Sequence, residues 1–191
     1  MRLAFTSIFL LVSLFLSAQI CPIAGTCGTC YIADVSVDNG FSNPTNVCSP
    51  GGFGDFKGQK FIEITPDGVF TLSVATNCLD VFVSGWVDWN GDETFDQTEV
   101  LAFAGTSVTG HTAILSNSLG GANVGDTVAM RIVLSADPTN IATDPCDPGL
   151  LFYCIEGEDY SVVITDTPTT GDDYCDAAGN DCGQLDNKLE G

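Results

Sequence analysis

Short segments in which apolar and polar residues alternate recur along most of this chain, and they restrict its fold more than any other feature. A period of two is typical of strands that bury one face. The connections between the segments are rich in Gly, Asn, Asp, Pro and Ser, the residues that turns favour. The expected strands cover residues 31–37, 60–64, 69–75, 81–88, 100–104, 127–135 and 158–164.

Helical periodicity is missing from the sequence beyond its N-terminal segment. We therefore predict an all-β fold, a two-sheet antiparallel sandwich of an immunoglobulin-like or jelly-roll-like kind. The chain has 191 residues, which is enough for one such domain with short extensions. We place this domain at residues 20–166.

Residues 1–19 have the pattern of a secretory signal peptide. Arg2 gives a positive start, and the apolar run "LAFTSIFLLVSLFLSA" ends in small residues, so cleavage is expected near Ala18 or Gln19. The run is short for a membrane span, and Ile20 stands where a lipoprotein signal usually has a small residue before Cys21. We expect a secreted or cell-surface protein without membrane insertion.

The charge of the chain is strongly one-sided. It has 25 Asp and Glu against five Lys and Arg, for a formal net charge of −20 at pH 7. Nucleic acids and anionic membrane surfaces would be repelled, so both are excluded as partners. Most carboxylates have no cationic side chain available to pair with them, and this composition favours divalent cations.

Nine cysteines in an exported chain indicate disulfide bonds and leave one cysteine over. The "CGTC" motif of Cys27 and Cys30 has the spacing of a redox dithiol, but the strand-like "YIADVSV" follows it where that chemistry needs a helix. A zinc site is not favoured, because the single histidine, His111, is far away in a Gly/Thr/Ser-rich loop. Cys48 with Cys78 is one expected pair.

The segment 88–99, "DWNGDETFDQTE", concentrates carboxylates between two apolar runs. Its oxygen-bearing residues have the spacing of an EF-hand-type calcium loop, here inside a β-hairpin. Position 7 would offer its backbone carbonyl and position 12 both carboxylate oxygens. The predicted Ca²⁺ ligands are Asp88, Asn90, Asp92, Thr94, Asp96 and Glu99.

One departure affects the second half of this loop. Position 6, normally glycine because the backbone turns sharply there, is Glu93, and Gly91 stands two residues earlier. Three ligands are therefore less firmly placed than Asp88, Asn90 and Asp92, namely Thr94, Asp96 and Glu99. The alternative to a calcium loop is a solvated acidic turn.

The amino-acid composition changes near the end of the sequence. Residues 167–173 read as a polar linker. Residues 174–191 begin with "YCDAAGNDCG", in which Cys, Ala, Gly, Cys and Gly follow the same order as in "CPIAGTCG" at 21–28. We interpret 174–191 as the truncated start of a second repeat and expect at least one more domain of this kind beyond it.

Several motifs together resemble the GEVED domain, a module of secreted bacterial proteins. "WVDWNGDETFDQTE" is similar to its "WIDWNxDGxFxxxGE" core, and "IEGEDYSVVI" to "GEVEDYTVxI", from which Ile155 and Gly157 depart. "GFGDF", "MRIVLS" and "DPCDPG" resemble further family motifs. The resemblance implies a non-catalytic β-sandwich, common in multidomain surface or exported proteins, with no defined ligand. It also implies a Cys21–Cys146 disulfide. From the residues alone, a Cys146–Cys154 disulfide that closes a small ring is an alternative.

The carboxylates of "EGEDY" have two open interpretations. Glu156, Glu158 and Asp159 either add ligands to the calcium shell or hold a turn by accepting backbone N–H bonds. In a strand, Glu156 and Glu158 share one face and Asp159 takes the other.

Two classes of function remain open. The first is a calcium-stiffened module for adhesion, for binding a polysaccharide or surface protein, or for spacing further domains of the same chain. The second is a secreted glycosidase or other carboxylate-based hydrolase, with a pair such as Glu156 and Asp88. We expect no enzyme, since the acidic residues follow a metal spacing. Four aromatic residues offer stacking surfaces for sugar: Trp86, Trp89, Phe152 and Tyr153.

Overall fold

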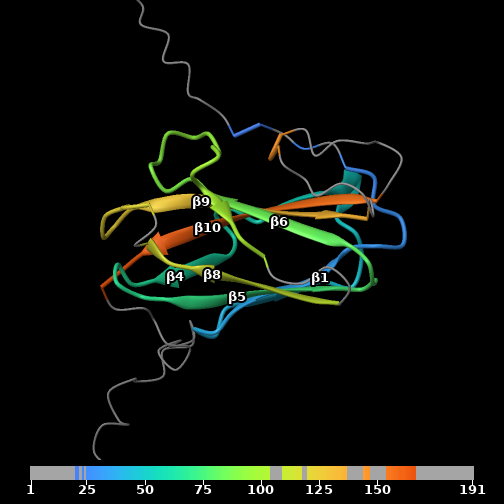
Figure 1. Ribbon diagram of the computed structural model, residues 1–191, viewed down its shortest axis with the longest axis horizontal. Coiled ribbons are helices and arrows are strands. Elements are labelled where there is room, and N and C mark those ends of the chain that lie inside the picture. The colour runs from blue at the N-terminus through green and yellow to red at the C-terminus, as the bar shows by residue number, and fades with distance from the viewer. Residues whose placement is uncertain are drawn as a thin grey trace, which may run out of the picture.

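The computed structural model describes residues 20–21, 23, 25–103, 109–117, 120–136, 144–146 and 154–166. The expected signal peptide, linker and second repeat lie outside these residues. Within them the chain forms two packed β-sheets, which confirms the all-β sandwich (Figure 1). No helix in this described part is long and apolar enough to cross a membrane.

The first sheet has four strands, in the order β2 (Ser42–Pro44), β1 (Ile32–Val37), β5 (Phe70–Thr76) and β8 (Gly110–Leu115). The second sheet has six strands. Its order is β3 (Phe53–Asp55), β10 (Ile155–Ile164), β9 (Thr127–Ser135), β6 (Phe82–Val87) and β7 (Val100–Leu101), and β4 (Phe61–Ile64) also pairs with β10. A short 3-10 turn, η1 (Pro50–Gly52), precedes β3.

Three strands were not predicted from the sequence: β2, β3 and β8. The first two have three residues each, too few for an alternating pattern to show. β8 was read as a loop because Gly, Thr and Ser dominate its start, and this interpretation is wrong: His111 is a fully buried strand residue. The pairing is also mixed, since β10 runs antiparallel to β9 but parallel to both β3 and β4.

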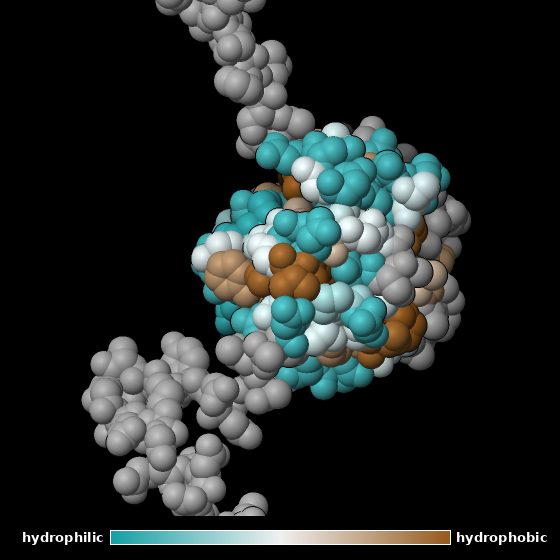
Figure 2. Space-filling view, turned by 90° about the vertical axis from the view of Figure 1, so that its left-hand side faces the viewer, coloured by the Kyte–Doolittle hydropathy of each residue, from teal (hydrophilic) through white to brown (hydrophobic). Residues whose placement is uncertain are grey.

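The main core lies between the sheets and contains the inward-facing residues of every long strand. In β10 these are the even-numbered residues, so Tyr160 packs there, edge-on to Phe41 and stacked on Phe56. Polar residues cover much of the outside, and hydrophobic side chains gather in small patches (Figure 2). The period-two pattern marks a buried and a more exposed face in β1 and β5, whereas β6, β9 and β10 are buried on both faces over most of their length.

A second, smaller core covers the outer face of the six-stranded sheet. Ile23, from the N-terminal segment, packs there with Trp86, Val133 and Ile155. Gly157 leaves room for this segment, because a Cβ at that position would lie 2.7 Å from Cδ1 of Ile23. This departure from the family pattern thus coincides with a close approach of two chain segments.

Three disulfides connect the N-terminal segment to the sandwich. Cys21 pairs with Cys146, as the family resemblance implies, and Cys154 is a free thiol rather than part of a small ring. The expected Cys48–Cys78 pair is wrong. Cys27 bonds to Cys48 and Cys30 to Cys78. The two cysteines of "CGTC" thus bond to different segments, Cys48 after β2 and Cys78 after β5, and they form no redox pair.

The Cys21–Cys146 bond spans a sequence separation of 125 residues and should be a major source of stability. A closed loop of this length restricts the unfolded chain by about 4–5 kcal/mol. We expect the Cys21→Ser/Cys146→Ser double variant to lose free energy of unfolding of this order in urea titrations. A loss below about 1 kcal/mol would show that this bond does not restrain the unfolded chain as the entropic account requires.

Candidate functional site

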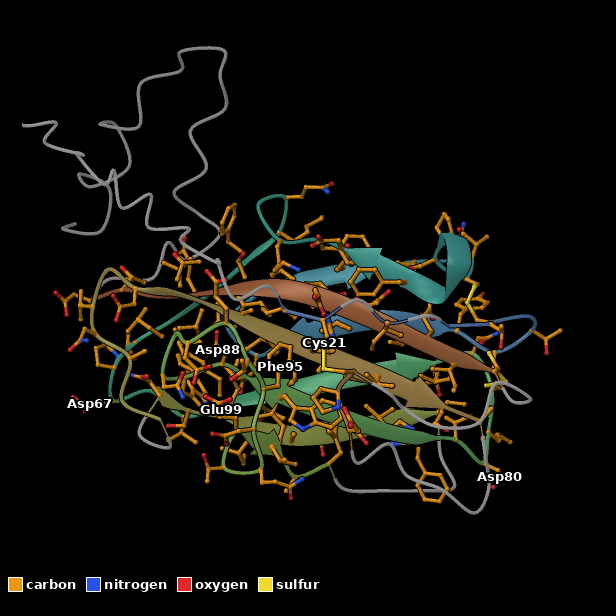
Figure 3. All side chains as sticks on the ribbon, turned by 90° about the horizontal axis from the view of Figure 1, so that it is seen from above. Cys21, Asp67, Asp80, Asp88, Phe95 and Glu99 are labelled. Carbon is orange, nitrogen blue, oxygen red and sulfur yellow. A yellow bond between two sulfur atoms is a disulfide. The ribbon has the colours of Figure 1, made fainter. Side chains whose placement is uncertain are left out.

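The acidic segment 88–99 forms a loop between β6 and β7 over the outer face of the six-stranded sheet. Backbone bonds hold both of its ends: Val87 N–H donates to the Glu99 carbonyl at 3.0 Å, and Asp88 N–H donates to the Ala129 carbonyl at 2.9 Å. Figure 3 shows Asp88, Phe95 and Glu99 close together, with Cys21 near Phe95 on the same side of the molecule. The hairpin context predicted from the sequence is therefore correct.

Two carboxylates of the loop are buried, and each ties distant parts of it together. Asp88 is 3% exposed and Glu99 is 4% exposed. Asp88 accepts the N–H groups of Asp92 at 3.1 Å and Glu93 at 3.0 Å. Glu99 accepts those of Asp96 at 3.0 Å and Asn90 at 3.4 Å. The first and last residues of the expected calcium loop thus lie inside it and organise its backbone.

The middle ligand positions face solvent and form local turns. Asn90 Oδ1 accepts the Asp92 N–H at 2.8 Å, and Asp92 Oδ1 accepts the Thr94 N–H at 2.9 Å. The bonds from the Thr94 side chain and backbone lower the pKa of Asp92. Asp96 makes the equivalent turn with Thr98. The lowered pKa favours the ionised form of Asp92, which suits cation binding.

The backbone passes through the left-handed region at Gly91, with φ 69°, and at Glu93, with φ 63°. Position 6 therefore makes the sharp turn of a calcium loop although it lacks glycine. A residue with a side chain is strained in this conformation. Asp88 stabilises the turn by accepting the N–H of Glu93 itself.

The two buried carboxylates of the loop have raised pKa values and no cationic partner among the described residues. Burial raises the pKa of both Asp88 and Glu99, and each is also raised by a neighbouring carboxylate. Within the described residues, neither has a Lys or Arg nitrogen within 4.0 Å. Buried carboxylates without a cation are unusual unless hydrogen bonds or a metal compensate them. The donor set of carboxylate, amide and carbonyl oxygens fits Ca²⁺.

The ligand atoms are not drawn together in this structure. In the part of the chain that it describes, one group of three Cys, His, Asp or Glu ligand atoms lies within 4.8 Å: Cys27, Cys48 and Glu156. Its two sulfurs form a disulfide, so this group is no metal site. The carboxylates of the acidic loop are spread more widely, and four of them accept backbone N–H groups: Asp88, Asp92, Asp96 and Glu99.

Phe95, at position 8 of the loop, anchors it to a buried ion pair. The Arg131 guanidinium lies between the rings of Phe95, at 5.3 Å, and Phe53, at 5.5 Å. It donates two hydrogen bonds to Asp159, at 2.7 and 2.8 Å. A further bond, of 2.9 Å, reaches the Pro145 carbonyl next to Cys146. Arg131 therefore joins the acidic loop, β10 and the Cys21–Cys146 disulfide.

Sequence reasoning did not find this role of Arg131, although a signal was present. A single cationic residue in the otherwise apolar "VAMRIVLS" needs a buried partner, and Asp159 is the carboxylate of "EGEDY" that faces the same side of the sheet. Asp159 also pairs with Lys57, at 2.8 Å. Its charge is thus compensated by two cations, which leaves it no role in the acidic loop.

Glu156 serves the second of the two roles left open by the sequence. It is fully buried and accepts the backbone N–H groups of Ile32 and Ser49, both at 2.6 Å. It therefore links β10 to the start of β1 and to the segment before η1. Because both oxygens are engaged away from solvent, the carboxylate is not positioned as a partner of Asp88 in hydrolysis.

Glu158 sits in the interior beside Tyr160. Its Oε2 accepts the Tyr160 hydroxyl at 2.6 Å, and that hydroxyl accepts a bond from Asn43 at 3.0 Å. Its Oε1 has no hydrogen-bond partner. Burial raises the pKa of Glu158 to about 8, so the neutral acid is the favoured form at neutral pH. None of the three "EGEDY" carboxylates joins the acidic loop.

Two hollows flank the acidic loop. One, of about 220 Å³, is lined by Ile20, Lys57, Asp88, Glu93 and Ser161, among others. The other, of about 290 Å³, borders Trp89 and Asn90 on one side and Asp126 and Thr127 on the other. Trp86 and Trp89 are both buried, so neither offers a free face to sugar. Phe152 and Tyr153 lie outside the described residues.

Glu158 should make stability depend on pH in an unusual direction. Its folded pKa of about 8 exceeds the ordinary value of 4.5. The stabilisation of the fold that Glu158 contributes as the neutral acid is therefore complete below pH 4.5 and is lost as pH rises towards 8. Across this window the loss approaches about 1.4 kcal/mol per pH unit. We expect Glu158→Gln, which cannot ionise, to gain stability relative to wild type from pH 5 to 8 in urea titrations. A constant difference between the two proteins would show that Glu158 does not titrate there.

Comparison with known proteins gives a family for this arrangement. Neither a curated protein nor a solved structure matches the chain. The family described as the GEVED domain matches residues 82–163. This span contains β6, the acidic loop, β9 with Arg131, and β10 with Asp159. This match supports the resemblance to the GEVED domain family that the sequence motifs indicate.

Proposed function

We propose that this protein is a non-catalytic extracellular module whose acidic loop binds Ca²⁺ and which serves in adhesion or as a spacer within a multidomain exported protein. The observation that carries the proposal is the pair of buried carboxylates, Asp88 and Glu99, which have no cationic partner among the described residues. The GEVED family match supports a module of this kind. The disulfides are consistent with export.

The residues that would hold the ion are those of the loop itself. Asp88 and Glu99 supply buried charge, Asn90 and Asp92 supply exposed side-chain oxygens, and Thr94 supplies a carbonyl. Bound Ca²⁺ turns the mutual repulsion of these groups into attraction to one centre. Because the carboxylates are spread in this structure, binding requires the exposed side chains to move towards Asp88. A site that must be assembled in this way suits the modest affinity of extracellular calcium modules.

Two observations favour a binding or spacer role over hydrolysis and over sugar stacking. Glu156 is sealed from solvent by two backbone N–H groups, so it is unsuited to act as an acid or a nucleophile. The buried tryptophans give no platform for carbohydrate. Three partner classes remain for this module: a surface protein, a polysaccharide held by polar groups, or a neighbouring domain of the same chain.

Calcium should raise the thermal stability of the oxidised protein. With a dissociation constant on the order of 0.1–1 mM, millimolar Ca²⁺ should add about 0.4–1.4 kcal/mol of stability over EDTA. Magnesium should substitute poorly, because it prefers a tighter octahedral shell. Differential scanning calorimetry in EDTA, Ca²⁺ and Mg²⁺ measures this. An unchanged midpoint on addition of Ca²⁺ to the wild type would mean that the loop is a solvated turn.

Two variants separate calcium binding from the folding of the loop. Asp88→Ala should abolish the calcium effect, since it removes the first ligand. Glu93→Gly relieves the positive-φ strain, so it should leave the effect intact or strengthen it while raising stability in EDTA by up to about 1 kcal/mol. Loss of the calcium effect in Glu93→Gly alone would contradict the assignment of ligands.

A further inference from the structure

The dipeptide Asn-Gly occurs twice in this chain, at Asn39–Gly40 and at Asn90–Gly91. Asparagine before glycine is chemically labile, because glycine has no Cβ to hinder the approach of its nitrogen to the preceding side chain. Both glycines have φ in the left-handed region, 100° and 69°, and open space where a Cβ would stand. The two sites are alike in these respects and differ in how the structure holds the asparagine side chain.

The side chain of Asn39 is tied to the folded core of the sandwich. It is half-buried in the turn between β1 and β2. Its Nδ2 donates to the Glu63 carbonyl of β4 at 2.5 Å, and its Oδ1 accepts the Phe41 N–H at 3.0 Å. Phe41 itself packs edge-on to Tyr160. Because β4 belongs to the other sheet, moving the Asn39 side-chain amide would break a connection between the two sheets.

The side-chain amide of Asn90 is bonded to a neighbour within its own loop. Asn90 is exposed. Its Oδ1 accepts the Asp92 N–H at 2.8 Å, and its Nδ2 donates to Asp92 Oδ2 at 3.1 Å. The Gly91 N–H makes a long bond, of 3.3 Å, to the Asp88 carbonyl. The amide of Asn90 can therefore turn towards the Gly91 nitrogen without disturbing a strand or the core, and it is open to water.

We propose that Asn90 is a site of spontaneous deamidation, which adds a carboxylate to the acidic loop as the protein ages. The Gly91 nitrogen attacks Cγ of Asn90 and forms a new N–C bond. The bond between Cγ and Nδ2 breaks, and ammonia leaves with the proton that the Gly91 nitrogen gives up. Water then opens the cyclic succinimide at either of its carbonyls, which gives aspartate or isoaspartate. Water is the co-reactant, so the conversion needs neither an enzyme nor a change of oxidation state.

Deamidation would change the electrostatics of the loop. The Asn90 amide donates to an Asp92 oxygen, and a carboxylate in its place would face that oxygen as a like charge. Without a cation, the loop should therefore be less stable after deamidation. Asn90 is also one of the expected Ca²⁺ ligands, and the number of charged ligands tunes calcium affinity. This second effect rests on the calcium function proposed above, whereas the deamidation itself does not.

Peptide mapping by mass spectrometry tests the deamidation, with the oxidised protein kept in EDTA at mildly alkaline pH, either folded or unfolded in urea. In the folded protein, Asn90 should convert at least about tenfold faster than Asn39, because an exposed loop opens locally at little cost. In urea the two sites should convert at similar rates, and a difference that persists there would show that the structure does not select Asn90. Equal rates in the folded protein would overturn the proposal, as would no conversion of Asn90 while the unfolded sample converts.

Two substitutions test the effect on the loop by differential scanning calorimetry. Asn90→Asp imitates the aspartate product, and Asn39→Asp is the matched control outside the loop. In EDTA, Asn90→Asp should unfold at a lower temperature than wild type. Ca²⁺ should then raise its midpoint by more than that of wild type or Asn39→Asp. An equal rise in all three proteins would overturn the effect on calcium binding. A wild type with no rise would refute the calcium function as well, and the conversion rates in EDTA judge the deamidation separately.

Discussion

The ion pair between Arg131 and Asp159 holds together the parts of this molecule that the sandwich alone would not. Both side chains are buried, and breaking such a pair by removing one partner typically costs about 3–5 kcal/mol. The ion pair also positions neighbouring segments, because the guanidinium donates to the Pro145 carbonyl and lies against the rings of Phe53 and Phe95. The N-terminal segment, the acidic loop and the disulfide at Cys21 all meet at this one cation.

The acidic loop depends on this contact at one point and on its own carboxylates elsewhere. Phe95 packs against the Arg131 cation, which fixes the loop over the sheet. Asp88 and Glu99 accept backbone N–H groups from inside the loop and so hold its turns in place. The same two groups remain short of positive charge. In the calcium site that we propose, these two carboxylates would supply buried charge, and the exposed ligands would have to move towards them on binding.

The three carboxylates of β10 show how position decides the role of one residue type. Glu156 accepts two backbone N–H groups, Glu158 shares a proton network with Tyr160, and Asp159 pairs with Arg131 and Lys57. Strand alternation puts the first two inside and the third on the outer face. The acidic residues of this motif therefore have structural roles within the domain, and one of them, Glu158, favours the neutral form.

The sequence by itself determined the β class, the positions of most of the longer strands, and the hairpin position of the acidic loop, because these follow from local periodicity and turn composition. It gave no sign of β2 and β3, whose patterns are too short, and it misplaced β8. Only the tertiary structure decided that Cys27 reaches Cys48 and Cys30 reaches Cys78, and that Arg131 meets Asp159. These pairings join residues far apart in the chain, and packing in three dimensions sets such distances, which no local pattern of residues encodes.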